Sequence, residues 1–428
     1  MSEFKGYSGK SLSLLKQNNA KVGDSIKITS DLTYSGILMP RYESGDDSHI
    51  ILKLKSGYNV GINITEIQKI EVISGQETKS KEEIKQQKEN SSLPKILLIS
   101  TGGTIASKVD YRTGAVTPAL SAAELNEAVP ELAKIANIDS EVLFSEYSEN
   151  LQPEHWLEIA KKLDSLANSD YTGIMIAHGT DTMHYTSSFL SFALSGFPIP
   201  IALVGSQRSS DRPSSDAALN LIATTKFLTE SNVKGIFVVM HNDSNDDTIV
   251  CHKGTRVRKN HTSKRGAFET VGDNPAFIIT ENKIEKNMDE EFFNNPKYEP
   301  KLNLDAKVAL VKYHPGYDPK QIKDLADLGF GAIIFEGTGL GHVGNTMYDV
   351  IKDAKEQGLF LGMTSQCLDG NVSMTVYDSG RDLLDLGVIP LENMIPETAL
   401  VKAMWAYGNT KNSDEIKALM LKNIASEF

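Results

Sequence analysis

The sequence predicts an α/β protein, with a doubly wound parallel sheet, a smaller α/β domain after it and a small β-barrel before it. Three observations support this fold class. From residue 95 onward, apolar segments of strand length alternate with amphipathic helical segments, as in a parallel sheet covered by helices. Two of these apolar segments run directly into small, hydroxyl-bearing residues. Before residue 75, short segments of alternating polarity are divided by turns rich in Gly and Asp, which is typical of antiparallel strands.

The N-terminal segment is expected to form an antiparallel barrel of SH3-like size over residues 1–75. Its strand candidates are residues 25–29, 34–38, 49–54 and 59–62. Such a module either packs as an inert appendage or docks a partner, and we favour docking. Residues 76–94 are charged and lack aromatic residues, which predicts a linker or, alternatively, a solvated surface helix.

Two α/β domains are expected after this linker, over residues 95–285 and 305–428. A polar, proline-containing stretch between them marks the boundary. The strand candidates are residues 95–100, 173–177, 199–204, 235–240, 276–280, 307–313, 331–336 and 359–364. The helix candidates include residues 153–167, 214–229, 348–357 and 398–406.

Composition and charge narrow the classes of function. The net charge is −12, and residues 96–428 hold 30 Lys and Arg against 44 Asp and Glu. Such an acidic body binds phosphate backbones poorly, so another chain is expected to hold any nucleic acid. The two cysteines, Cys251 and Cys367, do not have metal-ligand spacing. We find no apolar run of transmembrane length and no signal-peptide pattern, and we expect a cytoplasmic protein without membrane contact.

The two strand-to-turn segments carry the expected chemistry. One ends in Thr101-Gly102-Gly103-Thr104, and the other in His178-Gly179-Thr180-Asp181-Thr182. In an open parallel sheet these turns gather where ligands bind, at the carboxyl ends of the strands. A threonine hydroxyl becomes a nucleophile only when a base takes its proton, and Asp181 is a candidate part of that base system. Taken singly, the turns fit a phosphate cradle or a helix N-cap equally well.

Together, residues 99–107 and 173–183 resemble the signature segments of the L-asparaginase/glutaminase-type amidohydrolases, and the resemblance covers residues 95–428. It implies a catalytic set of Thr104, Thr180, Asp181 and a lysine from the basic loop at residues 253–268. The lysine that matches best is Lys259, with Arg258 and Lys253 as alternatives. In this family Thr104 attacks the carboxamide carbon of Gln or Asn, and the other three residues move protons and position water.

The same resemblance implies substrate-binding residues. Ser148 and Glu149 match a Ser-Gln pair that holds the α-carboxylate and α-amino groups, with Glu standing in place of Gln. Tyr111 is the only tyrosine available for the family's flexible loop, and His342 is the candidate that reaches the active site of a neighbouring copy. We interpret His178 as a support of the turn rather than a base.

The N-terminal module extends the resemblance to essentially the whole chain. Segments such as residues 56–62 and 253–264 resemble the D subunits of archaeal-type glutamyl-tRNA(Gln) amidotransferases. That family implies a homodimer of this chain within a heterotetramer. Its partner, the amidotransferase E subunit, uses ATP and Mg to convert Glu-tRNA(Gln), held mainly by the partner, to Gln-tRNA(Gln). This chain has no G-x-x-x-x-G-K-[ST] motif, and we expect no cofactor or metal in it. The alternatives are a free-standing cytosolic L-asparaginase or glutaminase, and a non-catalytic scaffold.

Overall fold

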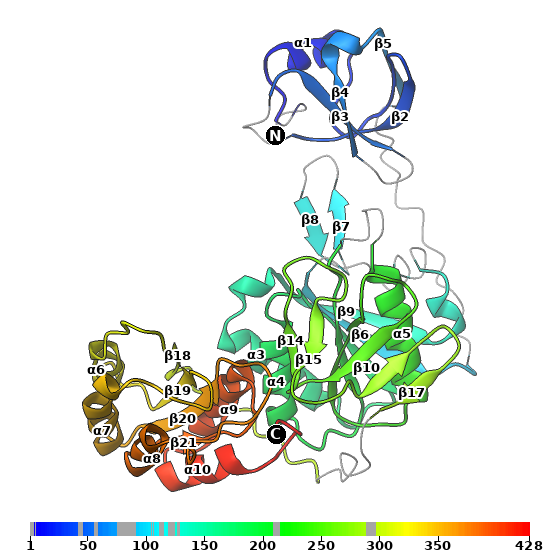
Figure 1. The fold of residues 1–428 in the computed structure, drawn as a ribbon. Helices are drawn as coiled ribbons and strands as arrows, with labels where there is room; N and C mark the ends of the chain where they lie inside the picture. Colours follow the sequence, from blue (N-terminus) through cyan, green and yellow to red (C-terminus); the bar gives the residue numbers. More distant parts are fainter. Residues whose placement is uncertain are drawn as a thin grey trace.

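The computed structural model describes residues 4, 6–41, 46–54, 59–74, 91–103, 105, 107–110, 115–118, 125, 129–208, 215–287 and 297–428. It confirms the predicted fold class: a small N-terminal β module, a large α/β domain and a smaller α/β domain (Figure 1). Among the described residues no helix is both long enough and apolar enough to cross a bilayer.

The N-terminal module is a five-stranded antiparallel sheet in the order β4-β3-β2-β1-β5. Its inward residues alternate along the strands, as the sequence predicts, and Ile26, Ile28, Ile50 and Leu52 have no exposed surface. One helix and one strand have no counterpart among the predicted elements, namely α1 and β5. The elements are α1 (Gly9–Gln17), β1 (Ser25–Thr29), β2 (Thr33–Leu38), β3 (His49–Leu54), β4 (Asn59–Asn63) and β5 (Lys69–Ser74).

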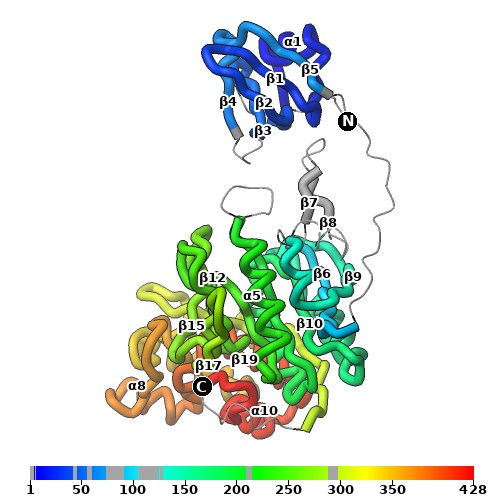
Figure 2. The backbone as a smooth tube through the Cα atoms, turned by 90° about the vertical axis from the view of Figure 1, so that its right-hand side faces the viewer, coloured from blue at the N-terminus to red at the C-terminus, as the bar shows by residue number. Residues whose placement is uncertain are grey.

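The large domain is built on an eight-stranded sheet in the order β17-β16-β13-β12-β11-β10-β6-β9. Five strands are parallel: β6 (Lys95–Gly102), β9 (Asn137–Glu146), β10 (Gly173–Ala177), β11 (Ile201–Val204) and β12 (Ile236–His241). The helices α3 (Pro153–Ser165), α4 (Met183–Ala193) and α5 (Ala217–Glu230) connect these strands (Figure 1), and Figure 2 shows α5 lying along the sheet beside β10 and β12.

At one edge the parallel strands of the sheet are extended by antiparallel ones. The strands β13 (Ile249–Lys253), β16 (Phe277–Ile279) and β17 (Ile284–Lys286) all pair antiparallel. The chain between β12 and β13 is too short for a crossover helix, and a parallel neighbour needs a connection of roughly a dozen residues or more. The predicted strand at residues 276–280 therefore lies in an antiparallel extension of the sheet.

The smaller domain is a four-stranded parallel sheet in the order β18-β19-β20-β21. Its strands are β18 (Val308–Lys312), β19 (Ala332–Gly337), β20 (Phe360–Ser365) and β21 (Ile389–Pro390). Its helices are α6 (Lys320–Asp327), α7 (Tyr348–Glu356), α8 (Asp378–Asp385), α9 (Pro396–Asn409) and α10 (Ser413–Leu421).

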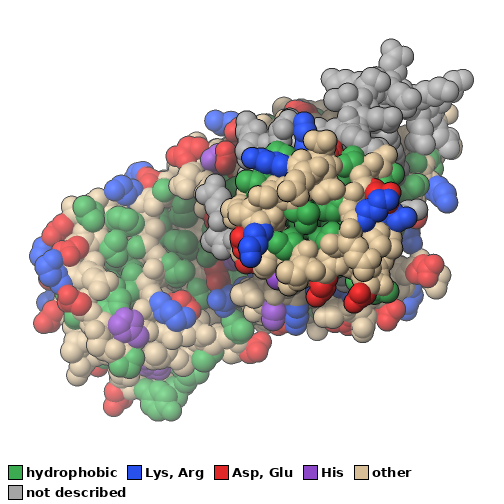
Figure 3. Space-filling model, turned by 90° about the horizontal axis from the view of Figure 1, so that it is seen from above, with side chains coloured by type: hydrophobic (Ala, Val, Ile, Leu, Met, Phe, Trp, Pro, Cys, Tyr) green, Lys and Arg blue, Asp and Glu red, His purple; other side chains and the backbone are tan. Residues whose placement is uncertain are grey.

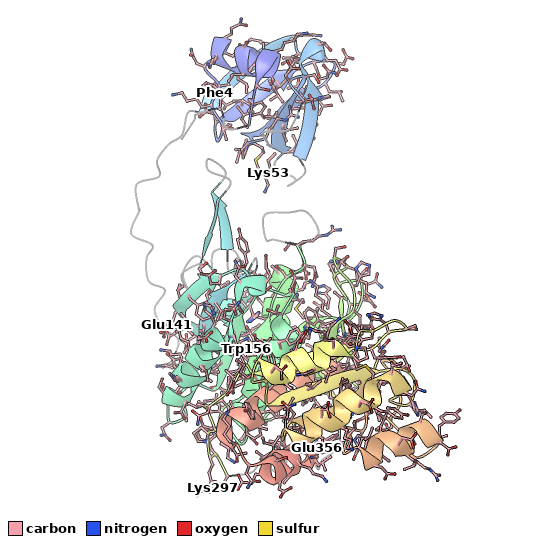
Figure 4. The ribbon with its side chains drawn as sticks, turned by 90° about the vertical axis from the view of Figure 1, so that its left-hand side faces the viewer. Phe4, Lys53, Glu141, Trp156, Lys297 and Glu356 are labelled. Carbon is pink, nitrogen blue, oxygen red and sulfur yellow. The ribbon has the colours of Figure 1, made fainter. Side chains whose placement is uncertain are left out.

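One hydrophobic core continues from the large domain into the smaller one through α4 and α9. The rings of Phe192 on α4 and Trp405 on α9 lie 5.9 Å apart. Trp156 of α3 belongs to the same core and stacks on Phe189, and Figure 4 shows it inside the body, whereas Lys297 and Glu356 project at the surface. The two α/β domains therefore share a packed interface rather than a flexible joint. Residues 288–296, within the predicted boundary, lie outside the described residues.

Candidate active site

The two predicted turns lie side by side at the carboxyl ends of β6 and β10. These strands pair in parallel register, with Ala177 opposite Ser100. The Thr101 hydroxyl donates to the Ala177 carbonyl over 2.9 Å. Gly103 has φ +79°, and a Cβ there would lie 2.7 Å from the Gly179 nitrogen. Only glycine permits this approach at position 103, because any side chain there would collide with the second turn.

Lys259 joins the second turn from 78 residues further along the chain. Its Nζ donates to Thr180 Oγ1 over 2.8 Å and to Asp181 Oδ1 over 2.6 Å. The Lys259 side chain is only 9% exposed, whereas that of Asp181 is 65% exposed. The structure therefore places an ammonium group between a hydroxyl and a carboxylate at the ligand-binding edge of the sheet.

Lys259 is positioned by a strand, and not by the basic loop that the sequence predicts. It ends β14 (Val257–Lys259), which pairs antiparallel with β15 (Phe268–Thr270). The alternatives to Lys259 make ion pairs elsewhere. Lys253 Nζ lies 2.6 Å from Asp273, and Arg258 Nε lies 3.1 Å from Glu397. Of the three predicted candidates, Lys259 is the one hydrogen-bonded to Thr180.

Thr104 and Tyr111 lie outside the described residues. Their roles as nucleophile and flexible-loop tyrosine stay predictions from sequence. Thr104 directly follows Gly103 in the chain, and Gly103 touches the turn that carries Thr180.

Ser148 and Glu149 share a short 3-10 turn, η3 (Ser148–Asn150), but differ in burial. Ser148 is buried against the second turn, because a Cβ on Gly179 would lie 2.9 Å from its Oγ. Its carbonyl accepts a hydrogen bond from Thr182 Oγ1 over 2.8 Å. Glu149 is exposed. The turn thus presents one residue packed against the Thr180 segment and one open to solvent.

His178 is held by hydrogen bonds within the turn. Its Nδ1 lies 2.6 Å from the Gly179 carbonyl and its Nε2 lies 2.9 Å from Thr186 Oγ1. A carbonyl can only accept, so Nδ1 carries the proton and Nε2 accepts from the threonine hydroxyl. Burial lowers the pKa of His178 to about 4, so the ring is neutral at pH 7. These contacts are those of a residue that supports the turn.

His342 follows β19 in the smaller domain. Its ring meets Tyr377 edge-on at 5.7 Å, and its Nε2 is buried without a hydrogen-bond partner among the described residues. Its expected contact with a neighbouring copy stays a prediction.

Two residues near the site escape sequence reasoning, His184 and Glu397. Burial, followed by the charges of Arg258, His178 and Lys259, lowers the pKa of His184 to about 4. Glu397 pairs with Arg258 from the first turn of α9. Neither residue belongs to a motif, and only the tertiary fold brings them to β14.

Acid is expected to destabilise the protein through its buried histidines. Burial lowers the pKa of His178 and His184 to about 4 and that of His252 to about 3, against about 6.5 in an unfolded chain. Because the folded pKa values are depressed, the unfolded state binds more protons as the pH falls below about 6.5. Each histidine then lowers the free energy of unfolding by up to about 1.4 kcal/mol per pH unit until its folded pKa is reached.

Urea unfolding between pH 7.5 and 5 measures this slope. His252→Asn should make it shallower, whereas the same change at the exposed His314 should leave it unchanged. An unaltered slope in the His252 variant would contradict the linkage.

No group of three or more His, Cys, Asp or Glu within the described ranges is arranged to hold a metal ion.

Comparison with known proteins places this site in a family. Residues 20–73 match the model of the GatD N-terminal domain, residues 95–291 that of "Asparaginase, N-terminal", and residues 307–420 that of "Glutaminase/Asparaginase C-terminal domain". The D subunit of the glutamyl-tRNA(Gln) amidotransferase of Pyrococcus abyssi is 45% identical over 428 residues, covering 97% of this chain and 96% of that protein. This chain belongs to the D-subunit family of glutamyl-tRNA(Gln) amidotransferases.

Other relatives agree with this assignment. The D subunit of Sulfolobus acidocaldarius is also 45% identical, over 99% of this chain and 95% of its own length. The solved thermostable L-asparaginase of Thermococcus kodakarensis superposes with a TM-score of 0.70 at 32% identity, covering 78% of this chain and 98% of that one. The chain is therefore an amidotransferase D subunit that combines asparaginase-type amidase domains with an added N-terminal module.

Proposed function

We propose that this D subunit releases ammonia from the side-chain amide of glutamine, or of asparagine, with Thr104 as nucleophile. The observation that carries the proposal is the Lys259 ammonium bridging Thr180 and Asp181, beside the glycine turn that precedes Thr104. A lysine buried between a hydroxyl and a carboxylate is suited to accepting a proton from that hydroxyl and returning it.

The residues have distinct roles in this mechanism. Thr104 Oγ1 attacks the carboxamide carbon, its proton passes to the leaving nitrogen, and ammonia departs from an acyl-enzyme. Water then attacks the ester, and the proton it loses returns to Thr104 as the carboxylic acid leaves. Thr180 and a transiently neutral Lys259 take up and return these protons, and Asp181 orients the lysine. Backbone N–H groups of the glycine turns stabilise the oxyanion.

Substrate recognition is assigned to residues around this centre. Ser148 and Glu149 bind the α-carboxylate and α-ammonium groups. The ionised Glu149 side chain can only accept hydrogen bonds, so it is assigned to the α-ammonium group. Tyr111 closes over the substrate, and His342 contributes from the neighbouring copy. The packing of Ser148 against Gly179 supports its part of this assignment.

The ammonia passes to a partner, the amidotransferase E subunit, which converts Glu-tRNA(Gln) to Gln-tRNA(Gln) with ATP and Mg. This chain needs no cofactor of its own, acts in the cytoplasm and forms a homodimer within a heterotetramer. Its acidic body favours a partner as the main holder of tRNA. Figure 3 shows hydrophobic side chains at the surface of the smaller domain, at the left of the view. Leu368, Val376 and Tyr377 are large hydrophobic residues of this domain with exposed side chains, which suits an interface with another chain.

Glutamine hydrolysis measured in three mixtures tests this coupling. We expect a low rate for the chain alone and a higher rate with the E subunit. When Glu-tRNA(Gln) is added as well, the rate should rise further, by roughly 5- to 150-fold over the chain alone, the usual range of allosteric coupling. Closure of the site by the partner is the physical reason. Equal rates in all three mixtures would favour a free-standing amidohydrolase.

A further inference from the structure

The segment that leads to Lys259 is held by the smaller domain of the same chain. Residues 255–258 make four polar contacts with residues 393–425, and each contact crosses the domain interface. Thr255 O accepts from Thr398 Oγ1 at 2.8 Å, Thr255 Oγ1 donates to Ala425 O at 2.8 Å, Arg256 Nη1 donates to Asn393 O at 2.9 Å, and Arg258 Nε lies 3.1 Å from Glu397 Oε1. The strand bearing the proposed base is thus anchored outside its own domain.

Of these four contacts, the one between Arg258 and Glu397 joins two charged side chains. Glu397 is 8% exposed, and its second oxygen is buried without a hydrogen-bond partner among the described residues. It lies in the first turn of α9, where the helix dipole favours a carboxylate. Loss of one member of such a pair leaves the other charge poorly compensated. The position of Arg258 therefore depends on Glu397.

Arg258 and Lys259 are consecutive residues of one strand, so their side chains point to opposite faces. Lys259 reaches Thr180 from one face while Glu397 holds Arg258 from the other. A shift of Arg258 therefore moves the backbone that sets the position of the Lys259 ammonium group.

We propose that Glu397 is a positioning residue for the amidase reaction, which fixes Lys259 against Thr180 through Arg258. The proposal rests on the function proposed above.

The test is the isosteric variant Glu397→Gln in the complex with the E subunit and Glu-tRNA(Gln). Misplacing a catalytic group by about 1 Å costs on the order of 100-fold, so kcat for glutamine should fall roughly 10- to 100-fold. KM should stay within about twofold, because Glu397 holds the base and not the substrate. Glu397→Asp, which keeps the charge, should recover part of the loss. Glu356→Gln removes the same charge from a surface pair on α7 and should change nothing.

A double variant, ammonium-dependent amidation and the Lys259→Met variant complete the test. The double variant Arg258→Gln/Glu397→Gln should lose no more activity than the more impaired single variant, because both changes break one connection. Ammonium-dependent amidation should persist in every variant, which shows that the complex is folded. An unchanged kcat in Glu397→Gln, or multiplicative losses in the double variant, would overturn the positioning role. Full activity in Lys259→Met would instead overturn the proposed function.

Discussion

Replacement of Thr104 by alanine is expected to abolish glutamine- and asparagine-dependent amidation. Without the attacking oxygen no acyl-enzyme forms, and removal of such a nucleophile costs roughly 10⁴- to 10⁶-fold in kcat. Amidation with free ammonium, assayed with the E subunit, ATP and Glu-tRNA(Gln), should persist because it bypasses the amidase. Comparison of the two nitrogen sources therefore separates loss of chemistry from loss of fold.

Thr101 offers a matched control three residues earlier in the same turn. Its hydroxyl already donates to the Ala177 carbonyl, so it serves the backbone and not the substrate. Thr101→Ala should retain most glutamine-dependent activity. Full glutamine turnover by Thr104→Ala, or an equal loss in both variants, would remove Thr104 from the role of nucleophile.

The central strands could be predicted because burial on both faces leaves a simple sequence signal. Four of the five residues of β10 are apolar and all five are buried, and β19 and β20 are buried along their whole length. Strand β9 has no counterpart among the predicted strands, because it lies at the sheet edge, where most of its residues are partly or fully exposed. Its alternation of apolar and polar residues is correspondingly weak.

Helix α4 is not among the helix candidates named from the sequence, for the opposite reason. All but one of its residues are buried between the sheet and α9, so it lacks the polar face that reveals an amphipathic helix. Its serines make the segment look polar in the sequence. In the structure, the hydroxyls of Ser187 and Ser188 donate hydrogen bonds to buried backbone carbonyls. A search for apolar residues repeating on one helical face therefore does not detect a helix that is buried on nearly all sides.

The site could be predicted where it follows from neighbours in sequence. Thr180 and Asp181 are adjacent in one turn, and the carboxyl-end rule for parallel strands places that turn beside Thr101-Gly102-Gly103. Lys259 came only from family resemblance, because its approach depends on the hairpin of β14 and β15. Glu397 lies on a helix of the other domain, and no local pattern connects it with Lys259.

Replacement of Lys259 by methionine is expected to lower glutamine hydrolysis by roughly 10²- to 10⁴-fold, the range that a positioned proton acceptor supplies. Methionine keeps most of the side chain's length and apolar contacts but cannot exchange a proton. Asp181 then loses its partner, yet its side chain is 65% exposed and stays hydrated, so the fold should survive. Ammonium-dependent amidation again reports the intact complex.

The same change at Lys264 is the control for charge alone. Lys264 lies in the same basic segment, 40% exposed and 3.7 Å from Glu269, so Lys264→Met should have little effect. Comparable losses at both positions would mean that the segment acts through its overall field, and the specific contact with Thr180 would lose its significance.

Lys259→Arg separates the two ways in which this lysine can serve the reaction. Arginine keeps the positive charge beside Asp181, but its guanidinium does not deprotonate in proteins. If Lys259 acts by accepting a proton, the arginine variant should be about as inactive as the methionine variant, with KM for glutamine little changed. If it acts only by its charge, the arginine variant should recover much of the activity. We expect the first result, because the hydrogen bond from Nζ to Thr180 Oγ1 is the path along which a neutral amine would take up a proton.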